Sequence, residues 1–391
     1  MRQTLIRLIL LLFQTPVILE AYTTGFLSLP DSTWLTQPGS KVLMAGPCSA
    51  ESPEQLLSTA KGIAAHYPNN IFRAGIWKPR TRPGSFEGIG DEAVKWLREV
   101  KCETGMRVAT EVATTHHVEL ALKNEIDVLW IGARTTGNPF HVQELAESLR
   151  GVDVPVLVKN PLHPDIQLWI GGLERFHRAG IARLGAIHRG FHAYENSGYR
   201  NVPRWQIVHS LKSIYPGLPV ICDISHIAGH REYLSTIAQQ AYDLNLEGLM
   251  IEAHCSPDKA LSDSQQQITP HDLHQLVTGL LARRVNFEDT DAMPMILEIR
   301  ERIDEIDRGL LDLLTRRMSL ASEIGELKRD HNVSILQLQR WKEIIDHCMT
   351  LADEKGLNRE FVKNVLIQIH DEAIRLQSKI LSEAGMVKIG K

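Results

Sequence analysis

Eight short apolar segments, each followed by an amphipathic one, constrain the fold of this 391-residue chain more than any other feature. The apolar segments, rich in Val, Ile and Leu, lie at residues 42–45, 71–74, 107–112, 128–133, 154–159, 183–188, 219–224 and 248–253. The amphipathic segments lie near residues 53–65, 91–104, 115–124, 138–149, 165–179, 203–214, 229–244 and 270–283. Strands that alternate with helices predict parallel pairing. Eight such units predict a (β/α)8 TIM barrel over residues 38–284. A doubly wound open sheet is the alternative, and the lack of a G-x-G-x-x-G sequence disfavours it.

The pattern changes after the eighth unit. Residues 285–294 (VNFEDTDAMP) are polar, contain a proline and are typical of a linker. Beyond them the apolar side chains recur at steps of four and three, at Ile299, Ile303, Ile306, Leu310, Leu313, Leu320, Ile324 and Leu327. This period predicts one long amphipathic helix, and two further helices are expected near 336–354 and 359–384. A single long helix cannot bury such a seam alone. We therefore expect residues 295–391 to form an all-α domain that pairs as an intertwined homodimer.

Composition excludes several classes of partner. The net charge of −4 provides no basic field, so we expect no nucleic-acid binding. Five cysteines are scattered without paired spacing, which indicates a reducing compartment and predicts a cytoplasmic protein. Residues 1–37 begin like a signal peptide, but Gln14 and Pro16 interrupt the apolar run, which is too short to span a membrane. We interpret this segment as a leader outside the folded domains, disordered or not native, and expect no membrane association.

Four potential metal ligands follow strands of the predicted barrel, where catalytic side chains gather. Cys48 comes just after the first strand, and alone it could equally be a small core residue. His226 lies after the seventh strand, Glu252 ends the eighth, and Asp263 follows shortly after. A thiolate, an imidazole and two carboxylates could hold a divalent ion of intermediate softness. The thiolate favours zinc or iron(II), while the carboxylates also suit manganese; Asp223 is expected to support a ligand.

A second group at the same strand ends is cationic. Its members are Lys78, Arg80, Arg134, Lys159 and Arg189. Most cations of this kind lie on solvated helix faces, but a charge at a strand end is poorly solvated and needs compensation. Convergence of lysine and arginine there predicts an anionic ligand, a phosphate or a carboxylate, with more than one anionic group.

The predicted long helix carries cations of its own. Arg317 interrupts the apolar seam, and Lys328 lies about 20° from it around the helix axis. Arg300 lies roughly 100° from Arg317 and could reach a neighbouring site. A cation in a seam needs an anion or ligand to compensate it. The alternative is a coiled-coil dimerisation module with a tolerated arginine.

The barrel motifs carry a family resemblance. AGPCSAES, KPRTRPGSFEG, IGAR, PVLVK, HRGF, DISHIAGHR and EAHCSPDKALSD occur in order, one per strand, over about residues 38–283. They resemble 3-deoxy-D-arabino-heptulosonate 7-phosphate (DAHP) synthase, of the class related to 3-deoxy-octulosonate 8-phosphate synthase. The K-P-R-T sequence favours the former. His188 departs from the family, which often has glutamate there, as do Ile224 and Ser264, which stand where the family often has proline and glycine.

This resemblance implies condensation of phosphoenolpyruvate with erythrose 4-phosphate. It implies that Lys78, Arg134, Lys159 and Arg189 hold phosphoenolpyruvate, and that Arg80 and Thr81 hold the sugar phosphate. The implied metal ligands are Cys48, His226, Glu252 and Asp263, with manganese the expected ion.

The helical segment resembles the all-helical chorismate mutase over about residues 296–384, on IRERIDEIDRGLLDLLTRRMSLASEIGELK, QRWKEII and HDEAIRLQ. The resemblance implies that chorismate rearranges to prephenate between Arg317, Lys328, Arg340 and Gln377, with Arg300 acting across the dimer. Gln337 and Ala373 stand where the family usually has an acid and a serine, which predicts a slower but active mutase.

Together the two resemblances predict a bifunctional shikimate-pathway enzyme. An entry step linked to a branch-point step predicts feedback, in which prephenate or chorismate on the helical domain inhibits the barrel. Two alternatives stay open. The helical domain could be a noncatalytic regulatory and dimerisation module, or the barrel could be an octulosonate phosphate synthase.

Overall fold

The computed structural model describes residues 34–35, 41–78, 84, 86–193, 198–283 and 292–388. They divide into two compact units on either side of residue 285. Of the predicted leader, only Trp34 and Leu35 fall within the described residues, and most of the predicted linker lies outside them. Within the described residues, no helix combines the length and apolar character needed to cross a bilayer.

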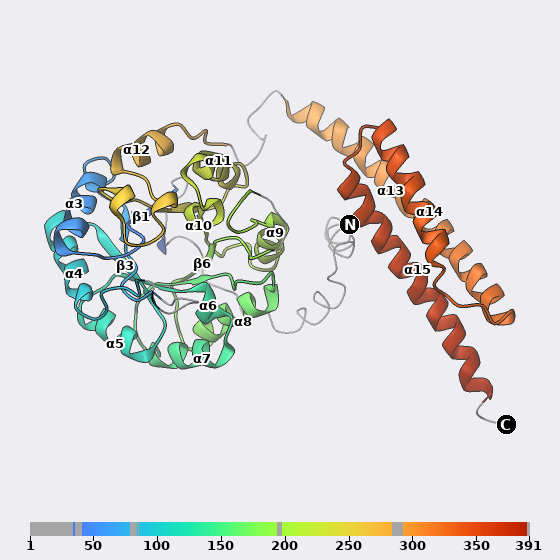
Figure 1. The fold of residues 1–391 in the computed structure, drawn as a ribbon, viewed down its shortest axis with the longest axis horizontal. Helices are drawn as coiled ribbons and strands as arrows, with labels where there is room; N and C mark the ends of the chain where they lie inside the picture. Colours follow the sequence, from blue (N-terminus) through green and yellow to red (C-terminus); the bar gives the residue numbers. More distant parts are fainter. Residues whose placement is uncertain are drawn as a thin grey trace. The chain divides into compact units, whose positions relative to one another are not determined.

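The first unit is a closed barrel of eight parallel strands, as predicted (Figure 1). Its strands are β1 (Val42–Gly46), β2 (Ile71–Arg73), β3 (Arg107–Val112), β4 (Val128–Ile131), β5 (Val156–Lys159), β6 (Leu184–His188), β7 (Val220–Asp223) and β8 (Gly248–Glu252). They pair in sequence order, and β1 closes the barrel by pairing with β8 from Val42 opposite Gly248 to Gly46 opposite Glu252. All eight strands therefore end at one rim, which brings together the side chains that follow them.

Helices surround the strands. They are α3 (Pro53–Ala64), α4 (Ala93–Thr104), α5 (Thr115–Lys123), α6 (Ala133–Thr136), α7 (Pro139–Ser148), α8 (Ile166–Arg178), α9 (Trp205–Ile214), α10 (Ile224–Ala228), α11 (Leu234–Asp243) and α12 (Pro270–Thr278). Side-chain oxygens cap several of them; Asp165, for example, accepts from the backbone N–H groups of Gln167 and Leu168 at the start of α8.

Strands β2, β4, β7 and β8 end one or two residues earlier than the sequence predicts, and two of these ends position site residues. Strand β4 stops at Ile131, and Arg134, which the sequence places after the strand, lies on the short helix α6. Gly132 lies between the strand and the helix, where a Cβ would collide with the Glu111 carboxylate. Strand β7 stops at Asp223, whose carboxylate caps α10 by accepting from the backbone N–H of His226 at 3.2 Å.

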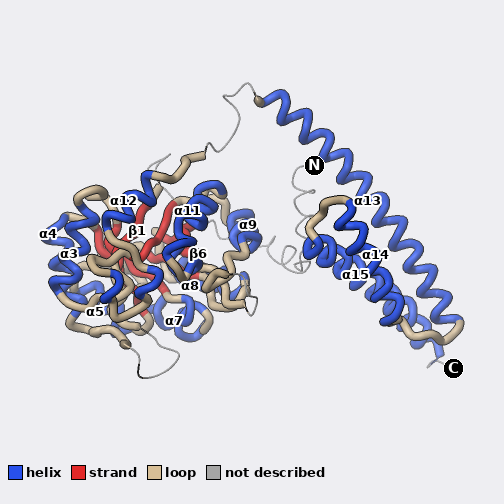
Figure 2. Tube along the Cα trace, turned by 45° about the horizontal axis from the view of Figure 1, so that its top comes forward, coloured by secondary structure: helices blue, strands red, loops and turns tan. Residues whose placement is uncertain are grey.

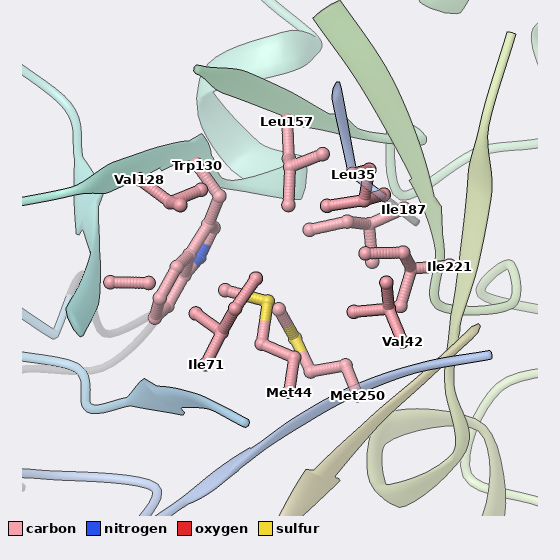
Figure 3. Packing of buried hydrophobic residues seen from close by; sticks show 11 residues of the cluster. Leu35, Val42, Met44, Ile71, Val128, Trp130, Leu157, Ile187, Ile221 and Met250 are labelled. Atoms are coloured by element: carbon pink, nitrogen blue, oxygen red, sulfur yellow. The ribbon is translucent and has the colours of Figure 1, made fainter. Parts of the chain in front are cut away.

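An apolar cluster fills the interior of the barrel (Figure 3). It joins inward-facing side chains of successive strands, among them Met44, Trp130 and Met250. Leu35, which the sequence assigns to the leader, is only 5% exposed and packs in this cluster. Its side chain covers apolar surface that the strands alone leave open.

The described residues of the second unit form three helices, α13 (Met293–Asp330), α14 (Leu338–Glu354) and α15 (Arg359–Lys388) (Figure 2). The long helix and both later helices are as predicted. Helix α15 packs closely on α13 where Gly325 faces the Gln377 side chain. The described residues leave the predicted seam of α13 uncovered: Ile306 is 63% exposed and Leu313 is 60% exposed.

Candidate active sites

Three of the four predicted metal ligands meet at the carboxyl end of the barrel. One donor atom each from Cys48, Glu252 and Asp263 lies within 4.8 Å of the other two. Cys48 and Glu252 are completely buried, so bulk water does not solvate these polar groups. A thiol from the segment after β1 and two carboxylates, one at the end of β8 and one in the segment after it, fit a divalent transition-metal ion when they lie this close.

The Cys48 thiol makes hydrogen bonds with two neighbouring side chains. Its Sγ donates to Asp263 Oδ2 at 3.2 Å, and Lys78 Nζ donates to the same sulfur at 2.9 Å. Burial, and then the Glu252 charge, raises the pKa of the thiol to about 12, although the Lys78 ammonium acts in the opposite direction. The thiol is therefore protonated at neutral pH, and a metal ion would have to displace its proton.

Glu252 is an ionised carboxylate in a dry site. It accepts from Arg73 Nη1 at 2.8 Å and from Gln266 Nε2 at 2.6 Å. Burial alone would raise its pKa, but His226 and Arg73 outweigh burial and lower that pKa to about 2. These two donors thus hold the carboxylate, one on each oxygen.

The fourth predicted ligand, His226, lies beside the other three. Its Nδ1 is 3.9 Å from Glu252 Oε1 and 3.0 Å from Asp223 Oδ1. With Nδ1 donating to Asp223, Nε2 keeps the lone pair that a metal ion needs. Burial lowers the pKa of His226, which favours this neutral form. Asp223 contacts His226 in the manner expected of a supporting residue.

Lys159 and Arg189 are buried cations at the same rim. Lys159 is 4% exposed and donates to Asp223 Oδ2 at 2.7 Å. Arg189 is 7% exposed and donates to Asn201 Oδ1 at 2.7 Å. Burial lowers the pKa of Arg189 to about 10; Asp223 opposes this fall, and the charges of Arg200 and Arg134 add to it. Buried cations that lie this close repel one another, and an anion bound between them would stabilise their charged forms.

Of the other predicted anion-binding residues, two lie at this site and two lie outside the described residues. Lys78 is half-buried beside Cys48, and Arg134 is exposed on α6. Both act electrostatically within the site, Arg134 on Arg189 and Lys78 on Cys48. Arg80 and Thr81 lie outside the described residues.

Two further cations of this site, Arg73 and Arg200, were not predicted from the sequence. Arg73, inside strand β2, is 2% exposed and lies over the Trp130 ring, 4.9 Å from its centroid. Arg200 donates to Asp263 Oδ1 at 3.1 Å and to Gln266 Oε1 at 2.7 Å. Arg73 could have been identified from the sequence, because it is a charged residue within the otherwise apolar strand sequence IFRA. No sequence pattern indicates Arg200.

His188, the departure from the family on β6, lies apart from the ligand group. It is completely buried and packs against the rings of Trp169, Phe191 and Trp205. Burial, reinforced by the neighbouring Arg189 charge, lowers its pKa to about 3. His188 is thus a neutral packing residue between β6 and helices α8 and α9.

The helical unit brings together three of its predicted site residues. Lys328 Nζ on α13 donates to Gln377 Oε1 on α15 at 3.2 Å and to the Ile335 carbonyl at 2.6 Å. Arg317 Nη1 donates to the Ile369 carbonyl on α15 at 3.5 Å. Both cations of α13 therefore face α15, and Gln377 is buried between the helices.

Arg340 and Arg300 are not part of this group in the single chain. Arg340 is exposed and pairs with Glu343 on the same helix at 3.2 Å. Arg300 is exposed near the start of α13. Gln337 stands at the N-cap of α14 without a capping hydrogen bond from its side chain, and Ala373 is buried on α15.

The fold and the first site define the class of protein: a (β/α)8-barrel enzyme whose catalytic rim combines thiol, carboxylate and buried cationic groups. The chain belongs to the DAHP synthetase I family, whose sequence model matches residues 32–282, more than half of the chain. Residues 299–378 match the model of chorismate mutase type II. The chain thus joins a barrel of the DAHP synthetase I family to a helical segment that is similar to chorismate mutase type II.

Two curated relatives and one solved structure are similar to this chain over about three fifths of its length. A phospho-2-dehydro-3-deoxyheptonate aldolase of Thermotoga maritima is 30% identical over 230 residues, 59% of this chain and 66% of the relative. The match therefore spans just under two thirds of that relative's length. A 2-dehydro-3-deoxyphosphooctonate aldolase of Paraburkholderia phymatum is 27% identical over 262 residues, 61% of this chain and 89% of the relative. A crystal structure of the Thermotoga DAHP synthase has a TM-score of 0.56 at 28% identity and covers 62% of this chain and 68% of its own.

Proposed function

We propose that the barrel condenses phosphoenolpyruvate with erythrose 4-phosphate, releasing DAHP and phosphate, with the help of a divalent metal ion. One observation carries the proposal: the group of Cys48, Glu252 and Asp263, of which the first two are fully buried, lies at the same barrel rim as the buried cations Lys159 and Arg189. A condensation of two phosphorylated substrates needs both features, since it must neutralise several anionic groups and activate an aldehyde.

Each residue then has a defined task. Cys48, Glu252 and Asp263 would hold the ion, with His226 Nε2 as the fourth donor, and we expect manganese. When bound, such an ion supplies Lewis-acid polarisation of the aldehyde oxygen. Lys78, Arg134, Lys159 and Arg189 bind the phosphate and carboxylate of phosphoenolpyruvate and orient its C3 toward the aldehyde, while Arg80 and Thr81 bind the sugar phosphate. Water adds at C2, and phosphate leaves.

The test follows phosphoenolpyruvate loss in the presence of erythrose 4-phosphate, before and after chelation and after manganese is added back. Loss that stops with chelator and returns with manganese supports the proposal. Turnover that ignores the chelator removes the metal role of Cys48. Several relatives are named as octulosonate phosphate aldolases, so arabinose 5-phosphate is the competing substrate. A preference for that sugar would replace the proposal with an octulosonate phosphate synthase.

For the helical domain we propose rearrangement of chorismate to prephenate. Arg317 and Lys328 hold the two carboxylates in a compact conformer, and Lys328 with Gln377 stabilises the developing negative charge on the ether oxygen. Arg340 and, across a dimer, Arg300 complete the site. The Lys328–Gln377 contact supports this assignment. Arg317→Ala is expected to abolish turnover, while Arg316→Ala, at the exposed neighbouring position, leaves it intact; equal rates in both variants would refute the assignment.

We also propose a cytoplasmic homodimer with feedback. The uncovered seam, including Leu313 and Ile306, supports pairing of α13 with a second copy. Prephenate or chorismate on the helical domain then inhibits the barrel. Barrel activity that ignores prephenate at every concentration would remove the feedback. A helical domain that affects the barrel but does not turn over chorismate would be a noncatalytic regulatory module, a reading that Gln337 and Ala373 keep open.

A further inference from the structure

One face of α15 points into the cationic site of the helical unit. His370, Ala373 and Gln377 lie three and four residues apart, a spacing that aligns side chains along a helix. Ala373 and Gln377 are each 7% exposed, and Gln377 meets Lys328 of α13. Arg317 reaches the carbonyl of Ile369, next to His370. His370 therefore belongs to the stripe of α15 that faces the two cations.

The His370 ring is held in one orientation. Trp341 of α14 stacks on it with ring centroids 4.0 Å apart and an interplanar angle of 14°. The Nε2 atom of His370 is buried and has no hydrogen-bond partner among the described residues. A buried polar atom without a partner is costly, and a bound ligand is one way in which such an atom is satisfied.

The charges around this ring come from two helices. Arg317 and Lys328 approach from α13, Asp371 is the neighbour on α15, and α14 contributes the uncharged Trp341. Burial, together with the two cations, lowers the pKa of His370, and Asp371 only partly opposes this shift. The ring is therefore largely neutral near pH 7 when no anion is present.

We propose that His370 is a ligand-binding residue of the helical site, whose Nε2 hydrogen-bonds a carboxylate or hydroxyl of the dianion held by Arg317 and Lys328. Trp341 is the positioning residue that fixes the ring for this contact. The inference rests on the proposed function of the same site, because that function supplies the dianion.

The proposal predicts a direction for pH dependence. A dianion placed beside the ring offsets the Arg317 and Lys328 charges, so the pKa of His370 rises in the complex. Binding then takes up protons, and the protonated ring binds the dianion more tightly. The affinity should therefore increase as the pH falls from about 8 to about 6.5, where the ligand carboxylates remain ionised.

The experiment titrates the full chain with prephenate by calorimetry at about pH 6.5 and about pH 8, in buffers with different ionisation enthalpies. His370→Phe keeps the ring stacking but removes the nitrogen, and should weaken binding about tenfold and abolish proton uptake. His370→Gln places an amide near the position of Nε2; it should recover affinity but not proton uptake. His347→Phe, at an exposed position on α14, is the matched control and should bind as the unaltered chain does.

Circular dichroism of each variant checks that the helices are formed. Equal affinity and equal proton uptake in His370→Phe and the unaltered chain would overturn the proposal, as would absence of prephenate binding to the unaltered chain. Chorismate turnover, measured in parallel, reports separately on the mutase assignment. Turnover with unchanged KM in His370→Phe leaves that assignment standing and removes the inference. Prephenate binding that depends on His370, without any chorismate turnover, would support the inference and refute the mutase assignment.

Discussion

Metal affinity of the barrel should rise about tenfold per pH unit between about pH 6.5 and about pH 8.5. The Cys48 thiol, with a pKa raised to about 12, keeps its proton throughout this range and must release it to bind an ion. Glu252, with a pKa of about 2, and Asp263, whose pKa is also lowered, are already ionised, and the lowered pKa of His226 favours its neutral form. One proton is therefore released per ion, which corresponds to a slope of about one in log affinity against pH.

The assay is a calorimetric titration of the chelator-treated chain with manganese at several pH values. Cys48→Ala should bind more weakly and lose most of the slope, because no thiol proton remains to be displaced. Cys102→Ala, which removes an exposed free cysteine, is the control and should keep both affinity and slope. A flat profile in the unaltered chain, or an unchanged slope in Cys48→Ala, would refute the reasoning.

Three other substitutions test the packing that supports the sites. Arg73→Met should lower the free energy of unfolding in urea by about 3–5 kcal/mol, because it leaves Glu252 as an unpaired buried charge. The control Arg183→Met, which breaks an exposed ion pair, should lower it by less than about 1 kcal/mol. Equal losses in the two variants would contradict this prediction. Leu313→Glu puts a charge into the exposed seam and should halve the mass measured by light scattering; an unchanged mass would argue against pairing through α13. Ala373→Ser adds a hydroxyl to the helical site and should raise mutase kcat/KM several-fold; an unchanged value would show that the hydroxyl is not used.

The elements of the barrel could be predicted because each has a strong local signal. Strand β5, expected at 154–159, forms over Val156–Lys159, and strand β6, expected at 183–188, forms over Leu184–His188. Local signals failed where tertiary packing sets the boundary. Strand β4, expected at 128–133, ends at Ile131, and helix α6 takes up Ala133–Thr136. The amphipathic segment 229–244 has its α-helix only over Leu234–Asp243, after a 3-10 turn at Arg231–Tyr233.

By itself the sequence determined the eight strand–helix units, the long helix α13 and the residue types at each strand end, because periodicity and motif order are local properties. Tertiary structure alone decided which side chains meet. Barrel closure places Glu252 of β8 beside Cys48 after β1, although 203 positions separate them in the sequence. It also decided that Arg73 supports Glu252 and that His188 faces the helices. The energies of buried charges depend on three-dimensional neighbours, which spacing along a chain does not specify.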